Sequence, residues 1–263
     1  VFFVLFIYTP LAHMTWHPDG LLRNWDVLDF AGGTVVHMSA GFAALAGAVY
    51  LGKRRKNVHS PSQVPYIILG TALLWFGWFG FNAGSALGAN LDAVSAFANT
   101  NFASAAAMIA WIFFDMFNKK KMSATGACIG AVVGLVAITP AAGFVTIGQS
   151  IFIGFISAVI SWYAVQIKNK SGLDDTLDVF PCHGIGGVSG MILTAVFAKD
   201  VGLVYGETTV FTHHMIALVC VSVFTFFGSL LLYKIVDLIT PIRVIEEKEL
   251  EGLDLSQHGE SVE

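Results

Sequence analysis

Long apolar runs separated by short polar stretches make up most of this chain. Eight of them approach the roughly 20 residues that a helix needs to cross about 30 Å of hydrocarbon. They lie at residues 1–16, 30–51, 65–88, 96–117, 123–142, 147–167, 179–198 and 211–239. None shows the alternation of a barrel strand, and helices satisfy their own backbone groups in lipid. The pattern predicts an all-α polytopic membrane protein with about eight transmembrane helices.

The composition excludes an ordinary soluble domain. The 263 residues are 56% hydrophobic and 12% charged, and the mean hydropathy is +0.72. The net charge is −4, and the basic residues form only short runs. Membrane topology explains such runs better than nucleic acid does, so we expect a lipid bilayer and no nucleic-acid partner.

Basic residues collect in alternate loops, as they do on the cytoplasmic side of membrane proteins. Only Arg23 and Lys199 lie on the other side. The rest are Lys53, Arg54, Arg55, Lys56, Lys119, Lys120, Lys121, Lys168, Lys170, Lys234, Arg243 and Lys248. The pattern predicts a multi-pass protein of the inner or plasma membrane, whose first segment leaves the cytoplasm and whose C-terminus lies within it.

Two regions are expected, a transmembrane domain at 1–239 and a polar cytoplasmic tail at 240–263. The chain opens with Val1 inside an apolar run, without an initiator Met, so we expect it to be N-terminally truncated. Cys128, Cys182 and Cys220 lie in or beside apolar segments without CxxC spacing. We interpret them as core residues and expect no metal site and no cofactor.

His37 and His183 stand inside otherwise apolar segments, where an ionisable side chain is costly and usually functional. Each shares a helical face with glycines that allow close packing: Gly33 and Gly41 around His37, and Gly187 and Gly190 after His183. A single such histidine could simply bond a neighbouring carbonyl. Two in the same setting favour a path or site inside the bundle.

The entries to the two histidine segments resemble each other. Asp29 precedes His37 by eight residues, and Asp178 precedes His183 by five. The segments cross in opposite senses, as inverted repeats do. Uninterrupted helices starting at the membrane surfaces would leave the histidines at different depths, about 10 Å and about 8 Å from opposite faces. We therefore predict an extended entry through 178–180, ahead of Pro181, that starts the second helix deeper.

Several strings of the chain resemble the ammonium transporter family, which includes the methylammonium permeases and Rh proteins. They are DFAGGTVVHMSAG, GWFGFNAGSALGAN, NTNFASAAAMIAW, GACIGAVVGLVAITPAAGFV, DVFPCHGIGGVSG and EGLDLSQHGE. The last of them favours the bacterial Amt branch. The resemblance covers nearly the whole chain and implies a homotrimeric, non-enzymatic transporter with an eleven-helix fold, of which this chain holds roughly the C-terminal two thirds.

The resemblance also implies roles for individual residues. His37 and His183 correspond to the paired pore histidines, and Phe81 to one of the phenylalanines that close the pore. In the outer vestibule, Trp16 would hold the cation with its ring, Ser85 would accept a hydrogen bond from it, and Asp29 would shape the recruitment site. Asp178 is expected as the counterpart of Asp29, and Trp78 as structural support. Taken alone, Trp16 could be an interfacial anchor, Phe81 a packing residue, and the aspartates helix caps.

Physical chemistry makes this function intelligible. Cation–π attraction, roughly 0.5 to 2 kcal/mol, can recruit ammonium at Trp16. Carrying the intact charge through an apolar pore would cost several kcal/mol, so the ion is expected to lose its proton and pass as ammonia. Neutral histidines could guide it or relay the separated proton. Potassium has no proton to lose and would be excluded.

Three alternatives remain open at this point. His37 and His183 could be the axial ligands of a haem, the chain could be an ammonium sensor, or it could be an Rh-type gas channel. The family resemblance further implies a P-II type nitrogen regulatory protein as a partner at the cytoplasmic face, and so a place in nitrogen metabolism.

Overall fold

The computed structural model describes residues 1–55, 63–118 and 120–260, and all regular secondary structure in this part of the chain is helical. Its α-helices are α1 (Thr9–Trp16), α2 (Leu21–Asn24), α3 (Ser39–Leu51), α4 (Val64–Gly84), α5 (Leu91–Phe117), α6 (Ala124–Ile138), α7 (Ile147–Ser171), α8 (Gly186–Phe197), α9 (Thr209–Ile239) and α10 (Glu246–Glu251). π-Helical turns form η1 (Val4–Tyr8), η2 (Gly33–Met38), η3 (Phe180–Ile185) and η5 (Asp254–His258), and a 3₁₀ turn forms η4 (Leu203–Tyr205).

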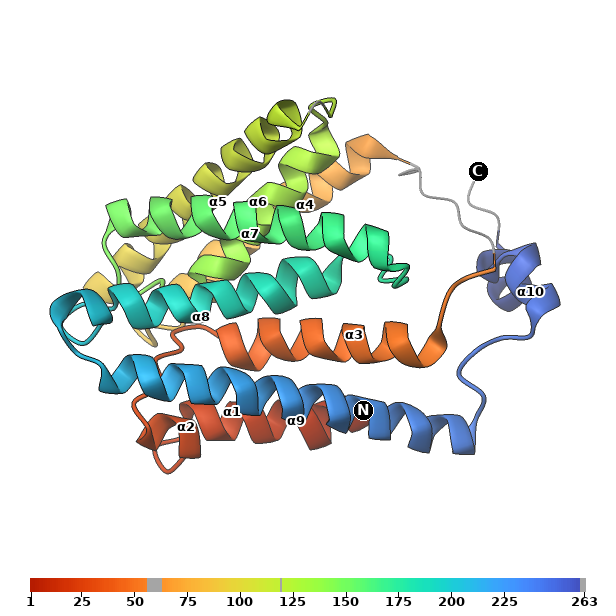
Figure 1. Ribbon diagram of the computed structural model, residues 1–263, viewed down its shortest axis with the longest axis horizontal. Helices are drawn as coiled ribbons and strands as arrows, with labels where there is room; N and C mark the ends of the chain where they lie inside the picture. Colours follow the sequence, from red (N-terminus) through yellow and green to blue (C-terminus); the bar gives the residue numbers. More distant parts are fainter. Residues whose placement is uncertain (56–62, 119, 261–263) are drawn as a thin grey trace.

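The long helices lie side by side in one bundle (Figure 1). α5 packs against α6 and α7, α3 packs against α9, and α8 contacts α6, α7 and α9. Two apolar clusters fill the bundle. One joins α1, η2, α8 and α9 around Leu11, Met38 and Met191, and the other joins α5, α6 and α7 around Ala103, Ile138 and Ile153.

Six helical stretches of the described chain are long and apolar enough to cross a membrane. They are Gly33–Leu51, Val64–Gly84, Leu91–Phe117, Ile147–Ser171, Phe180–Phe197 and Thr209–Ile239. Two of the eight predicted spans do not meet this criterion of length. The other two predicted spans are shorter apolar helices, η1 with α1 at 4–16 and the 15-residue α6.

α6 ends early because Pro140 follows Thr139 and cannot donate a backbone hydrogen bond. The chain then turns without regular structure, and Thr139, Ala141 and Ala142 are fully buried. Irregular backbone at membrane depth is tolerated where protein covers it. α6 is accordingly an interior helix, with Val133 to Ile138 inaccessible to solvent.

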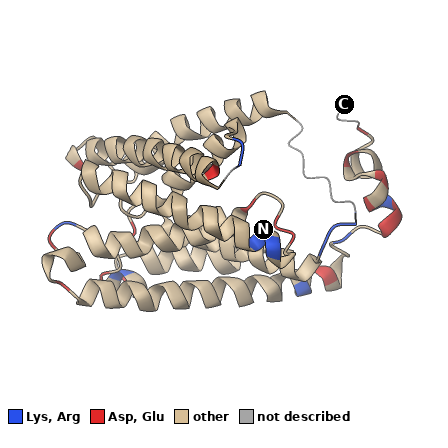
Figure 2. Ribbon diagram, turned by 45° about the horizontal axis from the view of Figure 1, so that its top comes forward, with Lys and Arg blue, Asp and Glu red and all other residues tan. Residues whose placement is uncertain are grey.

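Charged residues lie at the helix ends and in the connections, while the bodies of the helices are almost free of them (Figure 2). The basic connections meet at one end of the bundle: Arg54 pairs with Asp174 at 2.8 Å, and Arg243 bonds the Leu51 carbonyl. The end of α5 joins the end of α7 there through Lys120 and Gln166. Predicted basic residues Lys56 and Lys119 lie outside the described residues.

The helices that carry the two histidines cross where glycine faces glycine. A Cβ atom built on Gly41 of α3 would overlap the backbone of Gly184 in η3, so the two backbones are in direct contact. Gly187 likewise faces the Gly33 carbonyl and the Cβ atom of His37. The predicted small-residue faces are thus the faces that bring the histidine segments together.

We expect Gly41→Ala to lower stability by about 1–3 kcal/mol, because the new methyl group must push α3 away from η3. Thermal unfolding of the purified protein in detergent measures the effect. Gly77→Ala is the matched control: a Cβ on Gly77, in α4, would meet nothing within 4 Å, and alanine favours the helix. Equal stability of the two variants would contradict the close crossing.

Candidate functional site

The two intramembrane histidines meet, although 146 residues separate them in the sequence. His37 lies on η2 and His183 on η3, and their Nδ1 atoms are 3.3 Å apart, with ring centroids 5.4 Å apart. His37 is 2% exposed. A hydrogen bond between two Nδ1 atoms requires one to carry a proton and the other a lone pair. The pair can therefore not be doubly protonated while this bond exists.

Thr139 indicates which ring donates. Its hydroxyl lies 2.8 Å from the Leu135 carbonyl and can give its single proton there, while it accepts from the Trp78 indole N–H at 3.0 Å. The Nε2 atom of His37 lies 3.1 Å from the same oxygen and so acts as a donor. Neutral His37 then offers a lone pair at Nδ1, which accepts the proton of His183 Nδ1.

This assignment leaves the Nε2 atom of neutral His183 as an acceptor, without a protein hydrogen bond among the described residues. One of the two imidazoles is therefore anchored by Thr139, and the other presents a free lone pair. A chain of alternating donors and acceptors of this kind can receive or pass a proton.

Aromatic rings from α4 form a wall beside His37. The ring of Trp78 stacks on the imidazole with centroids 5.3 Å apart and planes at 18°, and the Phe81 ring lies 6.3 Å away. The two α4 rings meet edge to face at 5.5 Å. Aromatic rings thus cover one side of His37. Trp78, expected only as support, is in direct contact with His37.

Asp29 holds the beginning of the first histidine segment. Its carboxylate, 6% exposed, accepts the backbone N–H groups of Gly32, Gly33 and Thr34 at 2.6–2.8 Å, and also the Thr34 hydroxyl. Gly32 has a φ angle of +117°, which favours glycine. Asp29 is therefore the helix cap that the sequence allowed, and its backbone carbonyl also accepts the Trp16 indole N–H at 3.0 Å.

Trp16 and Ser85, the expected cation ligands, lie on different elements. Trp16 ends α1 and is 41% exposed. Ser85 follows α4, where its hydroxyl donates to the Phe81 carbonyl one turn back, at 2.9 Å. No hydrogen bond joins Ser85 to Trp16 in the described part of the chain. Ser85 contacts the backbone of Phe81, which in turn neighbours His37.

The second histidine segment is held by Asp175 rather than by Asp178. The Asp175 carboxylate accepts the backbone N–H groups of Val179 and Phe180 at 3.1 and 2.7 Å. Asp178 has a φ angle of +54° and pairs with Lys168 at 2.7 Å instead. Choosing Asp178 as the counterpart of Asp29 was therefore wrong. The missed signal was spacing, because Asp29 precedes His37 by eight residues and Asp175 precedes His183 by eight.

The predicted extended entry to the second segment was also wrong. Val179 has helical angles, and η3 begins at Phe180 with Pro181 in its first turn. The histidines meet for a different reason. Both segments begin inside the molecule, at aspartates that are each 6% exposed. The depth estimate had assumed that both helices start at the membrane surface.

The geometry of the pair does not suit a haem ligated through the two Nδ1 atoms. An ion held between two imidazole nitrogens at about 2 Å each would separate them by about 4 Å. The Nδ1 atoms are 3.3 Å apart and face each other directly, so neither an iron nor a macrocycle fits between them. The described residues also contain no group of three His, Cys, Asp or Glu side chains suited to a metal.

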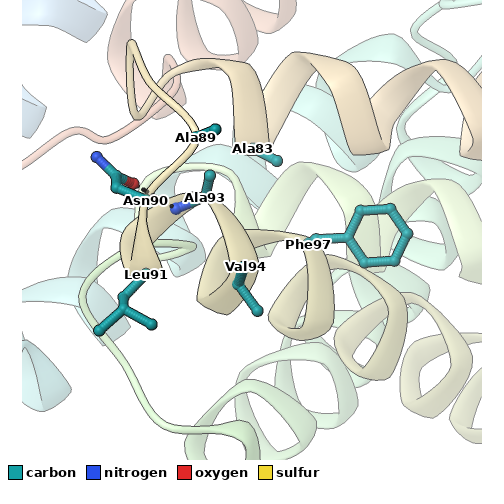
Figure 3. A pocket seen from close by; sticks show the side chains of 7 residues that line it. All are labelled: Ala83, Ala89, Asn90, Leu91, Ala93, Val94 and Phe97. Atoms are coloured by element: carbon teal, nitrogen blue, oxygen red, sulfur yellow. Dashed lines mark hydrogen bonds between the residues drawn. The ribbon is translucent and has the colours of Figure 1, made fainter.

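A hollow of the surface lies elsewhere. It has a volume of 710 Å³ and is lined by Ala83, Ala89, Asn90, Leu91, Ala93, Val94 and Phe97, around the connection between α4 and α5 (Figure 3). The only polar side chain among them, Asn90, accepts the Ala93 N–H and caps α5. None of the predicted site residues lines this hollow, so its size does not mark the candidate site.

The fold and this buried pair define a multi-pass, all-helical membrane protein with a histidine site inside its bundle. Comparison with known families identifies the class further. The model of the Ammonium Transporter Family matches residues 1–263. The chain therefore belongs to the ammonium transporter family, in agreement with the expectation of a non-enzymatic protein.

Individual relatives are similar over almost the whole chain. The ammonium transporter of Bacillus subtilis is 47% identical over 263 residues, which are 97% of this chain and 65% of that protein. The ammonium transporter of Aquifex aeolicus is 45% identical, over 97% of this chain and 62% of its own length. The chain thus spans less than two thirds of these relatives.

Solved structures agree with the fold. The crystal structure of Mep2 from Candida albicans superposes with a TM-score of 0.89 at 35% identity, and covers 94% of this chain and 59% of that one. A structure described as a sensor Amt protein gives a TM-score of 0.89 at 31% identity, over 97% of this chain and 68% of that one.

Thr139→Val should disturb the site through hydrogen bonding alone, because valine has nearly the shape of threonine. The half-buried indole of Trp78 and His37 Nε2 would each lose a partner, at a cost of about 1–3 kcal/mol. Thermal unfolding measures this loss. Thr71→Val is the control, since the Thr71 hydroxyl bonds only the Ile67 carbonyl of its own helix. If both variants lose the same stability, Thr139 does not anchor the pair.

Proposed function

We propose that this chain is the conducting part of an ammonium transporter that recruits ammonium at an outer vestibule and passes ammonia. The observation that carries the proposal is the hydrogen-bonded pair of His37 and His183 beside the aromatic wall of Trp78 and Phe81. Family membership and the named transporters among its relatives support the substrate.

Recruitment is assigned to Trp16, Ser85 and Asp29. The Trp16 ring is accessible, and its N–H is already bonded to the Asp29 carbonyl, so the indole has a defined orientation. An ammonium ion on its face would be held by cation–π attraction, and the Ser85 hydroxyl could accept one of its protons. The Asp29 carboxylate is enclosed by four donors and acts by shaping the loop rather than by touching the ion.

Deprotonation follows from the apolar surroundings of the pair. An intact cation moving past Phe81 and Trp78 would lose its water without gaining equivalent ligands, at a cost of several kcal/mol. Ammonia is a small neutral base that can donate to the free lone pair of His183 Nε2. The proton that ammonium leaves behind could follow along the imidazole pair, because each ring has a donor and an acceptor.

The wider assembly belongs to the same proposal. We infer an eleven-helix fold with an inverted repeat, and residues 1–239 would contribute the later helices of that fold. We also infer that three copies of the protein form a homotrimer. Two observations support the repeat: the helical stretches Gly33–Leu51 and Phe180–Phe197 run in opposite directions, and a buried aspartate precedes each of them. The shared basic end of the bundle supports its cytoplasmic placement in the inner or plasma membrane.

The tail at 240–263 would lie in the cytoplasm, where a P-II type protein is the proposed partner. Its helix α10 is attached to the connection after α3: Arg243 pairs with Glu249 at 2.9 Å and bonds the carbonyls of Leu51 and Lys53. The Arg55 N–H donates to Glu249 at 2.8 Å, and its guanidinium lies 3.6 Å from Glu246. A docked tail of this kind can present a surface next to the pore exits.

Uptake of methylammonium by cells carrying the full-length gene tests the transport proposal. We expect His37→Ala and His183→Ala each to lower saturable uptake at least about tenfold, which corresponds to roughly 1.4 kcal/mol of barrier. Thr71→Val, the control variant above, is again the control. Unchanged uptake in both pore variants, or competition by potassium on equal terms with methylammonium, would contradict the mechanism. Saturable binding without uptake would favour a sensor.

Attachment of the tail should depend on pH through Glu249. The hydrogen bond from the Arg55 N–H, and then those from Arg243, lower the pKa of this carboxyl below its usual value. Because the pKa of Glu249 is lowered only in the docked state, its contribution to docking is complete at pH values above the ordinary pKa of a glutamate. The contribution is lost as the pH falls through the lowered pKa. Limited proteolysis of the tail over a pH series measures this, and Glu249→Gln should abolish the pH dependence. A tail cleaved equally at all pH values would argue against the attachment.

A further inference from the structure

We propose that His214, near the start of α9, is a positioning residue of the recruitment site, which holds the backbone at Leu28 and thereby orients the Trp16 ring. The inference rests on the proposed function, because it gives His214 a part in the binding of ammonium. His214 acts through the loop between α2 and η2 and does not itself touch the ion.

His214 is fully buried and uses both of its ring nitrogens. The Leu28 backbone N–H donates to the Nε2 atom at 2.8 Å, so this nitrogen carries the lone pair. The neutral ring therefore has its proton on Nδ1, which donates to the Met191 carbonyl at 3.1 Å. One imidazole thus ties the loop that precedes the first histidine segment to α8, the helix that continues the second.

The Leu28 N–H depends on this imidazole. Among the described residues, it donates to no backbone carbonyl. A backbone N–H that packs against protein without an acceptor is costly, so His214 fixes where Leu28 can lie. The neighbouring His213 adds a second bond, because its Nδ1 atom donates to the Trp25 carbonyl at 2.7 Å. Two consecutive residues of α9 therefore hold both ends of the segment 25–28.

The position of Leu28 determines the orientation of the Trp16 ring. Asp29 is the next residue, and its carbonyl accepts the Trp16 indole N–H at 3.0 Å. This N–H is the only hydrogen-bonding group of the side chain. A Cβ atom built on Gly32 would lie 3.4 Å from the indole, so the ring also rests against the turn that Asp29 caps. A shift of this loop would therefore turn the proposed cation-binding ring.

A histidine with two satisfied nitrogens can also be an ordinary part of the core, and two substitutions distinguish these roles. Leucine has a similar volume but bonds neither Leu28 nor Met191. Glutamine offers an amide oxygen for the Leu28 N–H and an amide N–H for the Met191 carbonyl. If His214 only fills space, leucine should serve at least as well as glutamine. If it positions the loop, only glutamine should replace it.

Titration calorimetry of the purified full-length protein with methylammonium tests the role in binding. We expect His214→Leu to raise the dissociation constant about threefold or more, the change to which one hydrogen bond of ordinary strength corresponds. His214→Gln should stay within about twofold of the wild type, since it keeps both bonds. Equal dissociation constants in His214→Leu and the wild type, or a His214→Gln protein that binds as weakly as His214→Leu, would overturn the proposal.

Ser189→Ala is the matched control for a general loss of stability. It removes a buried hydroxyl of α8 that bonds Ser157 and the Gly186 carbonyl, away from the loop at 25–28. We expect it to lower the temperature of thermal unfolding without changing the dissociation constant. A rise in the dissociation constant equal to that of His214→Leu would mean that any weakening of the bundle impairs binding, and would contradict a specific role of His214.

Hydrogen exchange of the wild-type protein, measured by mass spectrometry at single-residue resolution, tests the contact without any variant. The Leu28 N–H should exchange at least about tenfold more slowly than the Asp19 N–H. The Asp19 N–H also donates to a histidine nitrogen, His17 Nδ1 at 3.1 Å, but at an exposed position. Equal exchange rates of the two amides would show that His214 does not hold Leu28, and would overturn the proposal.

Uptake measurements separate this inference from the proposed function. In His214→Leu, the methylammonium concentration for half-maximal uptake should rise by the same factor as the dissociation constant, while the maximal rate stays that of the wild type. A lowered maximal rate with unchanged half-saturation would overturn the role in recruitment. A wild type that binds methylammonium but takes up none would contradict transport, whereas weaker binding by His214→Leu would still support the positioning role.

Discussion

Two buried carboxylates start the helices on which the histidine site depends. Asp29 and Asp175 each accept backbone N–H groups of the turn that follows, so the helices begin inside the protein instead of at its surface. Helix ends carry unsatisfied donors, which would be costly in an apolar interior without such acceptors. The caps allow two oppositely directed segments to place their fourth or fifth residue at a common depth. Those residues are His183 and His37.

Close contact between the two helix backbones then brings the two histidines, which lie at a common depth, into direct contact. Gly41 and Gly184 let α3 and η3 cross without side chains between them, and both histidines stand on π-helical turns next to this crossing. π-Helical turns often occur at functional sites, because they shift side chains relative to an α-helix. Thr139, from the end of α6, and Trp78, from α4, complete the contacts of His37. Four segments that are distant in sequence, η2 with α3, α4, the end of α6 and η3, thus define one small site.

Much of the architecture could be predicted from the pattern of residues. Apolar runs of sufficient length marked the six spans, and the charges marked the two ends of the bundle. The strings around Asp29 and His183 indicated the family that the whole-chain match confirms. Contacts between segments could not be predicted in the same way. Nothing in the sequence indicated that Thr139 would bond His37, or that Asp175 rather than Asp178 would accept the backbone N–H groups before His183.

The sequence by itself determined that the chain is a helical membrane protein of the ammonium transporter family with two ionisable rings in its apolar interior. Hydropathy, charge placement and motif strings are local properties, and they persist whatever the neighbouring segments do. Only the tertiary structure decided which aspartate caps the second segment, that Thr139 bonds His37, and which imidazole of the pair donates. These outcomes depend on where backbone donors lack partners and on how closely helices approach, and both are set by packing between residues far apart in the chain.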